Sequence, residues 1–197
     1  MSRRYDAAKL RDRLVPIRFE RVYRVIRRVH ARTPLGAMPS PSRFSDPDAD
    51  YSVLYVAEAV LCGFWEAVIR DRFDRRGVRE LPRQDLESWL VAEITSHGAL
   101  HLVDLRDDGP IRIGAPTAVA HDSRHAAGQS LSAAVHNLLP EADGVLFHSR
   151  FTGDRCAAVF DRALDRLQVV SIEPLMQRVE VLDALDEYDI VLTEPED

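Results

Sequence analysis

The sequence predicts a single α+β domain, and three observations support this fold class. The chain has 197 residues, which is a usual length for one domain. Its composition, 46% hydrophobic and 29% charged, is that of a globular protein with a sizeable core. Short strand-like segments are interspersed with a few helical ones, without the regular alternation that produces a parallel sheet. We therefore expect a sheet with helices packed against it.

The first part of the chain predicts one short helix, two strands and one long helix. Ala7, Leu10 and Leu14 recur at helical spacing. Runs of valine, isoleucine and tyrosine favour strands, whereas a segment with four prolines and several serines favours an irregular loop. The expected elements are a helix over 6–14, a strand over 22–26, a loop over 31–52, a strand over 52–56 and a helix over 57–73.

The second part predicts a series of strands around one helix. Apolar and β-branched runs bounded by turn residues indicate the strands. The helix ends before Pro140, because proline cannot continue a helix. The expected elements are strands over 88–95 and 99–105, a helix over 123–139, strands over 144–149, 156–160 and 167–173, and weaker strands over 177–182 and 188–193.

Charge and basic-residue usage exclude some classes of function. The formal net charge is −6 and no basic cluster is present, which argues against direct binding of nucleic acid. Of the 26 basic residues only Lys9 is a lysine, and it lies in a polar stretch, so covalent catalysis by lysine is not expected. Arginine instead suits paired hydrogen bonds to carboxylate or phosphate, although a GC-rich genome also explains this bias.

The two ends of the chain carry opposite charge. Residues 1–21 contain seven basic and three acidic side chains, and residues 180–197 contain eight acidic and no basic ones. Either the two ends lie near each other or are simply solvated, or one of them meets a partner.

Cysteine usage and hydropathy predict a soluble cytoplasmic protein that does not enter a membrane. Cys62 and Cys156 lie far apart in sequence and form no CxxC motif, which suits thiols packed as small hydrophobes in a reducing compartment. The first residues lack the apolar core of a signal peptide. The longest apolar stretch, 53–69, is interrupted by Glu58 and Glu66.

Two charged residues occupy positions where an apolar side chain is expected. Arg24 shares a strand face with Val22 and Ile26, so its guanidinium needs a carboxylate or phosphate partner unless that strand lies at a solvated edge. Glu66 lies on the apolar stripe of the helix over 57–73, where it is either paired with an arginine or placed for chemistry. Glu58 falls in the first turn of that helix, where a negative charge is favourable.

Ser149 and two histidines are weaker candidates. Ser149 follows a predicted strand, where its hydroxyl can serve either a turn or a ligand, and no GxSxG motif surrounds it. His121 and His125 have a spacing that zinc ligands use, but the sequence offers neither HExxH nor a third ligand. GxGxxG and GxxxxGK[ST] are both absent, which removes the common nucleotide-binding motifs.

Taken in order, these residues resemble the RES-domain family, the toxin halves of RES–Xre toxin–antitoxin modules. The resemblance covers about residues 20–175, with residues 1–19 as an N-terminal extension containing the short helix and 176–197 as an acidic C-terminal extension that completes the domain. It is carried by Tyr23-Arg24, Ser42-Arg43-Phe44, Val53-Leu54-Tyr55-Val56-Ala57-Glu58, Phe64-Trp65-Glu66 and Asp143-Gly144-Val145-Leu146-Phe147-His148-Ser149-Arg150.

The resemblance implies a fold, an activity and a set of site residues. The fold would be that of the ADP-ribosyltransferases, with a central mixed or antiparallel sheet and flanking helices. The activity would be cleavage of NAD as a substrate without a metal, with ADP-ribose passing to a protein, phosphate or water. The implied catalytic residues are Glu66, Arg24 and Tyr55, and the implied NAD-binding residues are Arg24, Arg43, Tyr55 and Ser149.

The resemblance also implies a partner, a cognate Xre-type antitoxin that binds DNA in place of this chain and blocks the NAD cleft. A modified target protein is a second possible partner. The alternative is a non-catalytic binding module in which Arg24, Arg43 and Glu66 form a structural ion network and the acidic C-terminus contacts a partner.

Overall fold

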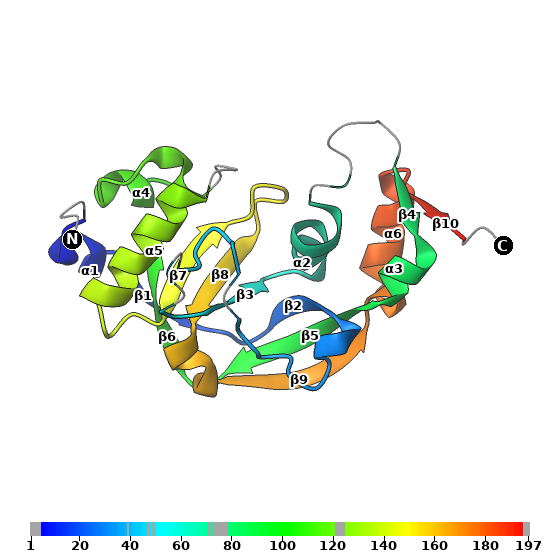
Figure 1. The fold of residues 1–197 in the computed structure, drawn as a ribbon, viewed down its shortest axis with the longest axis horizontal. Coiled ribbons are helices and arrows are strands. Elements are labelled where there is room, and N and C mark those ends of the chain that lie inside the picture. Colours follow the sequence, from blue (N-terminus) through cyan, green and yellow to red (C-terminus); the bar gives the residue numbers. More distant parts are fainter. Residues whose placement is uncertain are drawn as a thin grey trace.

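An eight-stranded sheet forms the centre of the structure (Figure 1), a computed structural model that describes residues 5–38, 40–46, 48, 50–70, 72, 79–120 and 125–194. All neighbouring strands are antiparallel except the parallel pair β6 and β7. This mixed sheet confirms the predicted α+β class. The strands in sheet order are β1 (Leu14–Arg18), β6 (Ala99–Asp104), β7 (Gly144–His148), β8 (Arg155–Phe160), β3 (Val53–Ala57), β2 (Val22–Arg27), β5 (Trp89–Ser96) and β9 (Leu167–Pro174).

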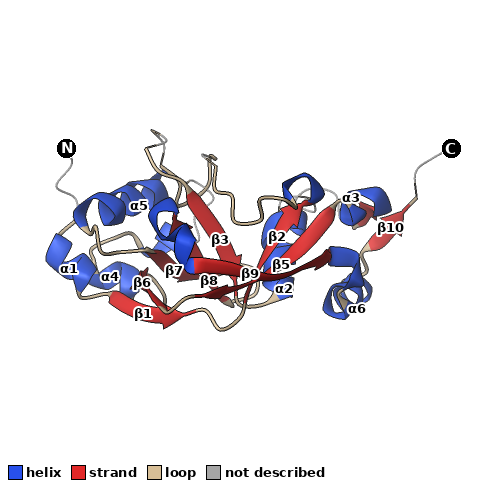
Figure 2. Cartoon of the chain, turned by 90° about the horizontal axis from the view of Figure 1, so that it is seen from below, coloured by secondary structure: helices blue, strands red, loops and turns tan. Residues whose placement is uncertain are grey.

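Helices cover the two halves of this sheet separately (Figures 1 and 2). The helices α1 (Ala7–Arg11), α4 (Gly109–Arg112) and α5 (Ala126–Leu138) lie with the half that contains β1, β6, β7 and β8. The other half carries α2 (Val60–Phe64), α3 (Arg83–Glu87) and α6 (Val179–Glu187), together with a small parallel sheet of β4 (Glu80–Pro82) and β10 (Val191–Thr193). Short 3₁₀ helices span Arg28–His30, Thr117–Ala120, Asp161–Arg166 and Leu175–Gln177.

The core follows the two-residue alternation of the central strands. On β3, Val53 and Ala57 face the cluster beneath α5, whereas Leu54 and Val56 face a second cluster on the opposite side of the sheet. β8 alternates in the same way. Each such buried aliphatic side chain contributes about 1.5–3 kcal/mol by leaving water. A third cluster, under α2, α3 and α6, includes Phe64.

The sheet is weakly joined between β2 and β3. In the described structure these strands share a single register pair, Tyr23 with Ala57, whereas β2 pairs with β5 along its whole length. The helix α2 packs against both strands at this joint. The two halves of the sheet therefore separate beside α2, and space opens between them.

Most predicted strands are confirmed, and the errors have clear physical causes. The expected helix over 57–73 is wrong in its bounds: α2 is short and continues into a π-helical turn, Trp65–Ile69. The expected strand over 177–182 is wrong, because Val181 and Leu185 lie one turn apart on the buried face of helix α6. The predictions that the structure confirms to within about two residues are the strands over 22–26, 52–56, 88–95, 99–105, 144–149, 156–160 and 167–173 and the described part of the helix over 123–139, while β10 lies inside 188–193.

Four short elements, β1, β4, α3 and α4, were not predicted. β1 follows directly on α1, so the helix expected over 6–14 is shorter than its apolar spacing indicates. β4, α3 and α4 have only three to five residues each, too few to show a periodicity. The proposed boundaries at 19/20 and 175/176 stay a prediction.

The two charged ends of the chain lie far apart. α1 and β10 occupy opposite ends of the long axis (Figure 1), so of the alternatives left open by the sequence, the one in which the two ends lie near each other is wrong. Their charges are partly paired nearby, Arg11 with Glu141 and Arg83 with Glu194.

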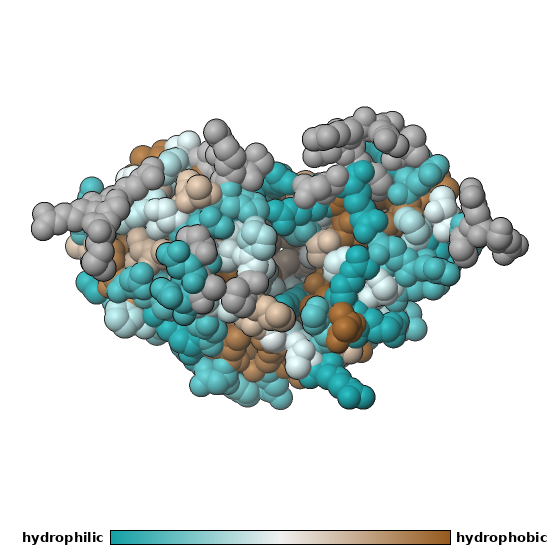
Figure 3. All heavy atoms as spheres, in the orientation of Figure 1, coloured by the Kyte–Doolittle hydropathy of each residue, from teal (hydrophilic) through white to brown (hydrophobic). Residues whose placement is uncertain are grey.

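On the face in Figure 3, hydrophilic residues cover most of the surface and hydrophobic ones gather in separate patches. No described helix has both the length and the apolar character needed to cross a bilayer.

Replacing Gly144 with alanine should strongly destabilise the fold. Gly144 begins β7 with a φ of +156°, and a Cβ there would lie 2.1 Å from the carbonyl oxygen of Ala158 on β8. Backbone in a central strand cannot move away without breaking the ladder, so we expect a loss of about 3 kcal/mol or more in the free energy of unfolding. Urea denaturation of both proteins measures it.

Gly98→Ala is the matched control. Gly98 also has a positive φ, +85°, but a Cβ there would meet nothing within 4 Å. Its cost should be only the conformational penalty of about 1 kcal/mol. Equal losses in the two variants would show that the close approach of β7 to β8 is not what requires glycine.

Candidate functional site

A pocket of about 280 Å³ opens where β2 and β3 separate, beside α2. It brings together four of the five residues singled out in the sequence, Arg24, Arg43, Tyr55 and Glu66. The fifth, Ser149, is hydrogen-bonded to Glu66. The other lining residues include Arg70, Phe147 and Cys156. Segments far apart in the sequence thus meet at one place.

Glu66 is held by a serine and makes no ion pair with the described residues. It belongs to the π-helical turn after α2, a local widening that is frequent at functional sites. Its Oε1 accepts a hydrogen bond of 2.8 Å from Ser149 Oγ. Ser149 is buried at the end of β7, and its Oγ also accepts the N–H of Phe151 at 3.1 Å. Ser149 therefore orients the Glu66 carboxylate and also stabilises the turn that follows β7.

Arg24 is a partly buried cation that no described carboxylate neutralises. Its Nη1 donates to the carbonyl oxygen of Pro34 at 2.8 Å. Burial lowers the pKa of Arg24 to about 10, so the side chain keeps its charge at neutral pH. Arg27, three residues further along β2, differs: it pairs with Asp85 at 2.5 Å and lies over the ring of Trp89. An anion in the pocket would supply the partner that Arg24 lacks among the described residues.

Arg43 reaches the pocket from the loop before β3, and that loop is held at its next residue. The Phe44 N–H donates to Tyr55 Oη at 2.8 Å, and the Phe44 carbonyl accepts from Ser132 Oγ at 2.6 Å. A Cβ at Gly128 on α5 would lie 2.5 Å from the Arg43 carbonyl oxygen, so only glycine permits this approach. Burial lowers the pKa of Arg43, and the nearby Glu66 carboxylate opposes the shift.

Tyr55 has two roles in the geometry. Its ring lines the pocket and lies edge-on to Phe147, with ring centroids 6.4 Å apart. Its hydroxyl accepts from the Phe44 N–H and donates to Ser42 Oγ at 3.1 Å. Burial raises the pKa of Tyr55, so it remains a neutral phenol. The hydroxyl is therefore engaged by the loop, and the ring is the part that faces the pocket.

Arg70 is a pocket residue that the sequence analysis missed. It follows the π-helical turn, four residues after Glu66, and that spacing on a helix was the available signal. Its Nη2 lies 3.3 Å from His125 Nε2, and His125 Nδ1 lies 2.8 Å from the Pro41 carbonyl oxygen. His121 lies outside the described residues, and the described part of the chain contains no group of three potential metal ligands.

The two cysteines, distant in the sequence, are neighbours in the structure. Cys62 Sγ and Cys156 Sγ are 3.3 Å apart, and both side chains are buried, as expected of thiols packed in a core. Their mutual hydrogen bond lowers the pKa of Cys62 and raises that of Cys156. Cys62 lies one helical turn before Glu66, so the pair packs α2 against β8 directly behind the site.

The expected position of Glu58 needs correction. It was expected in the first turn of the helix, where the helix dipole would favour it. Instead Glu58 precedes α2, whose N-cap is Ala59, and it forms a two-point ion pair with Arg155. This exposed pair joins the end of β3 to β8 and lies outside the pocket of Glu66.

The described lining of the pocket combines three arginines with a single oriented carboxylate. Arg24, Arg43 and Arg70 line it, and the described lining residues include only one acid, Glu66. Guanidinium groups form paired, charge-assisted hydrogen bonds with phosphate oxygens. A carboxylate with fixed orientation can stabilise positive charge that develops on a substrate. Such a site suits a phosphate-bearing ligand whose reacting atom becomes cationic.

The mixed sheet and this arginine-lined pocket define an α+β domain with a candidate site for a phosphate-bearing ligand. Comparison with known proteins identifies its family: residues 21–180 match the model of the RES domain, and the chain belongs to the RES domain family. It is 36% identical over 107 residues to a protein of Sinorhizobium fredii (strain NBRC 101917 / NGR234) named "Probable toxin y4kH", covering 54% of this chain and 84% of that protein.

A solved structure shares the fold. A chain in the crystal structure of the M. tuberculosis MbcT–MbcA toxin–antitoxin complex matches with a TM-score of 0.62. The match covers 84% of this chain and 89% of that chain, at 15% sequence identity. These comparisons confirm the predicted family and the predicted fold class.

Replacing Arg24 with methionine should leave the fold as stable or make it more stable. A base whose pKa falls on folding destabilises the folded state at every pH below its lowered value, here about 10. Methionine keeps the apolar part of the side chain, so we expect a gain of up to about 1 kcal/mol in the free energy of unfolding at pH 7. Chemical denaturation measures it.

Arg27→Met is the control on the same strand. It removes the ion pair with Asp85 and the contact over Trp89, and should cost about 1–2 kcal/mol. If Arg24→Met lowered the free energy of unfolding as much as Arg27→Met, Arg24 would be a stabilising residue of the fold. That result would contradict the view that Arg24 is kept for binding a ligand.

Proposed function

We propose that this chain is the toxin of a toxin–antitoxin pair and that it consumes NAD. The reaction is cleavage of the nicotinamide–ribose bond, with transfer of ADP-ribose to a protein side chain, to phosphate or to water, and growth arrest follows. The observation that carries the proposal is the pocket in which Arg24, Arg43 and Arg70 line the wall around the Ser149-bound carboxylate of Glu66. Membership of the RES domain family and the name of the S. fredii relative support it.

Arg24 and Arg43 would bind the pyrophosphate of NAD. That group carries two negative charges, and each guanidinium offers planar paired donors to its oxygens. Burial partly desolvates both arginines, so an ionic hydrogen bond to either is stronger than at the surface. Arg70 extends the same positive wall.

Glu66 would stabilise the transition state. Breaking the bond between nicotinamide and ribose develops positive charge on the anomeric carbon, as in glycoside cleavage. Nicotinamide leaves as a neutral molecule, so no general acid is required. A carboxylate near the ribose hydroxyls offsets the growing charge, and Ser149 keeps it oriented before the substrate arrives.

Tyr55 and Ser149 would position the nicotinamide end. The Tyr55 ring provides an aromatic face on the pocket wall, suited to a flat aromatic ring. The Ser149 hydroxyl, beside Glu66, can also donate to the nicotinamide or its ribose when substrate displaces the present bond. No metal takes part in this scheme.

A cognate antitoxin, of Xre type by the family resemblance, would cover the NAD pocket and bind DNA itself. The net charge of −6 suits a chain that leaves DNA binding to its partner. The matched solved structure is described as a toxin–antitoxin complex, which supports a partner of this kind.

The alternative, a structural ion network of Arg24, Arg43 and Glu66 in a non-catalytic module, has less support. Neither Arg24 nor Glu66 forms an ion pair with a described residue, whereas a network would join them. Ion-paired arginines do occur elsewhere in this fold, where Arg27 pairs with Asp85 and Arg155 pairs with Glu58.

Glu66→Gln should abolish most NAD turnover while the protein stays folded and binds NAD. Glutamine keeps the shape and can still accept the Ser149 hydrogen bond, but it cannot offset positive charge in the transition state. By comparison with loss of one preorganised electrostatic group, we expect kcat to fall about 10²–10³-fold. Nicotinamide release and the melting temperature are measured on the same preparation.

Glu58→Gln is the control, because it removes an exposed carboxylate on the same segment but outside the pocket. It should retain turnover. A Glu66→Gln protein that is folded and fully active would refute the catalytic role. One that loses about 3–5 kcal/mol of stability would instead point to a structural pairing.

A further inference from the structure

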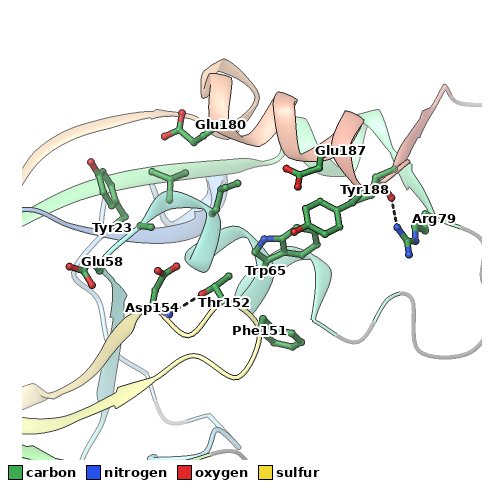
Figure 4. A pocket seen from close by; sticks show the side chains of 14 residues that line it. Tyr23, Glu58, Trp65, Arg79, Phe151, Thr152, Asp154, Glu180, Glu187 and Tyr188 are labelled. Carbon is green, nitrogen blue, oxygen red and sulfur yellow. Dashed lines mark hydrogen bonds between the residues drawn. The ribbon is translucent and has the colours of Figure 1, made fainter. Parts of the chain in front are cut away.

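A second and larger hollow of about 930 Å³ lies on the other side of α2 (Figure 4). Its walls are the start of α2 with Trp65, the loop between β7 and β8, and α6. Of its described lining residues only Tyr23 also lines the candidate NAD pocket. We propose that this groove binds a segment of a partner protein that presents an arginine or lysine side chain. The inference does not depend on the NAD chemistry.

The groove carries negative charge that the described residues do not neutralise. Glu58 and Glu180 line it but are paired with Arg155 and Arg178. Asp154, on the β7–β8 loop, and Glu187, on α6, form no ion pair with a described residue and come from opposite walls (Figure 4).

The groove's described lining includes one cation, and it is already engaged. Arg79 Nη1 donates to the Tyr188 carbonyl oxygen at 2.5 Å, at the edge of the groove (Figure 4). A carbonyl oxygen is neutral, so Arg79 keeps its charge, and the described lining sets the two unpaired carboxylates of Asp154 and Glu187 against this one guanidinium.

Aromatic rings between these carboxylates indicate what kind of cation fits. Trp65 and Tyr188 meet edge to face with ring centroids 4.9 Å apart. Phe151 and Tyr188 are 41% and 44% exposed, but the guanidinium of Arg150 already lies over the Phe151 ring, 4.6 Å from its centroid, so a partner's cation would meet Trp65 and Tyr188. Aromatic faces attract ammonium and guanidinium groups, and they also pack the apolar stem of lysine or arginine. A bare metal ion would use the carboxylates alone and gain nothing from the rings.

The surroundings favour a protein segment as the bearer of that cation. The groove is an open hollow much larger than one side chain, so a stretch of chain can lie along it. It adjoins the acidic C-terminal part of the chain, where the described residues 180–194 contain six acidic and no basic side chains. Such a field attracts a basic partner and raises its rate of association.

The groove is also close to the candidate NAD pocket without being part of it. Trp65 and Glu66 are consecutive on the π-helical turn, and they line the two different hollows. A partner segment in the groove would thus leave the pocket of Glu66 open.

The test is a titration of the full chain with a short peptide in which arginine and serine alternate, followed by tryptophan fluorescence. A peptide in which glutamate replaces arginine is the probe control. The groove variant is Asp154→Asn with Glu187→Gln. The protein control is Asp12→Asn with Asp165→Asn, which changes the net charge equally at two exposed sites that do not line the groove.

We expect the arginine peptide to bind, the glutamate peptide not to bind, and the groove variant to bind about tenfold more weakly, as two partly exposed charge contacts imply. The protein control should bind like the unmodified chain. No binding of the arginine peptide, or equal weakening in both variants, overturns the proposal.

Light scattering of the free chain adds a second readout. If the chain self-associates and the groove variant is monomeric, a second copy occupies the groove and the proposed partner is wrong. NAD turnover of the groove variant should be unchanged. A variant that keeps turnover but shows no groove-specific binding defect therefore refutes this inference and leaves the proposed function intact.

Discussion

The separation of β2 from β3 is the constraint on which the rest of the structure depends. These strands share one register pair, and the space beyond it becomes the candidate pocket. Arg24 and Tyr55 lie on the two diverging strands, Glu66 on the helix packed across them, and Arg43 on the loop that connects them. A fully paired sheet would have no room for a ligand at this place.

The second constraint is electrostatic. Burying Arg24 without a described carboxylate opposes folding, and its lowered pKa records that cost. Proteins retain such features where function requires them, and stabilise the fold elsewhere. Here the stabilisation comes from the clusters on both faces of the sheet and from the loop held by Tyr55 and Ser132. An anionic substrate would supply the partner that Arg24 lacks among the described residues. Substrate binding would therefore also offset the free-energy cost of burying Arg24.

Part of the fold and the site could be predicted from the sequence. Runs of apolar and β-branched residues identified β3 and β8, and a charge on an apolar face identified Arg24 and Glu66. Arg43 and Tyr55 carry no such local signal, and the family resemblance alone linked them to the site. The π-helical turn and the contact between Cys62 and Cys156 depend on tertiary packing, which local patterns do not encode, whereas Arg70 had a local signal in its helical spacing from Glu66. α6 was mistaken for a strand because its apolar residues also fit a short β-rich run.

The central claim is that this pocket breaks the nicotinamide–ribose bond of NAD. Its most direct test is mass spectrometry of the purified chain incubated with NAD in water, with phosphate, and with a cell extract as a source of protein acceptors. The account predicts nicotinamide release in at least one condition. The partner product, ADP-ribose, ADP-ribose phosphate or an ADP-ribosylated protein, would identify the acceptor. NAD that remains intact in all three conditions would contradict the account.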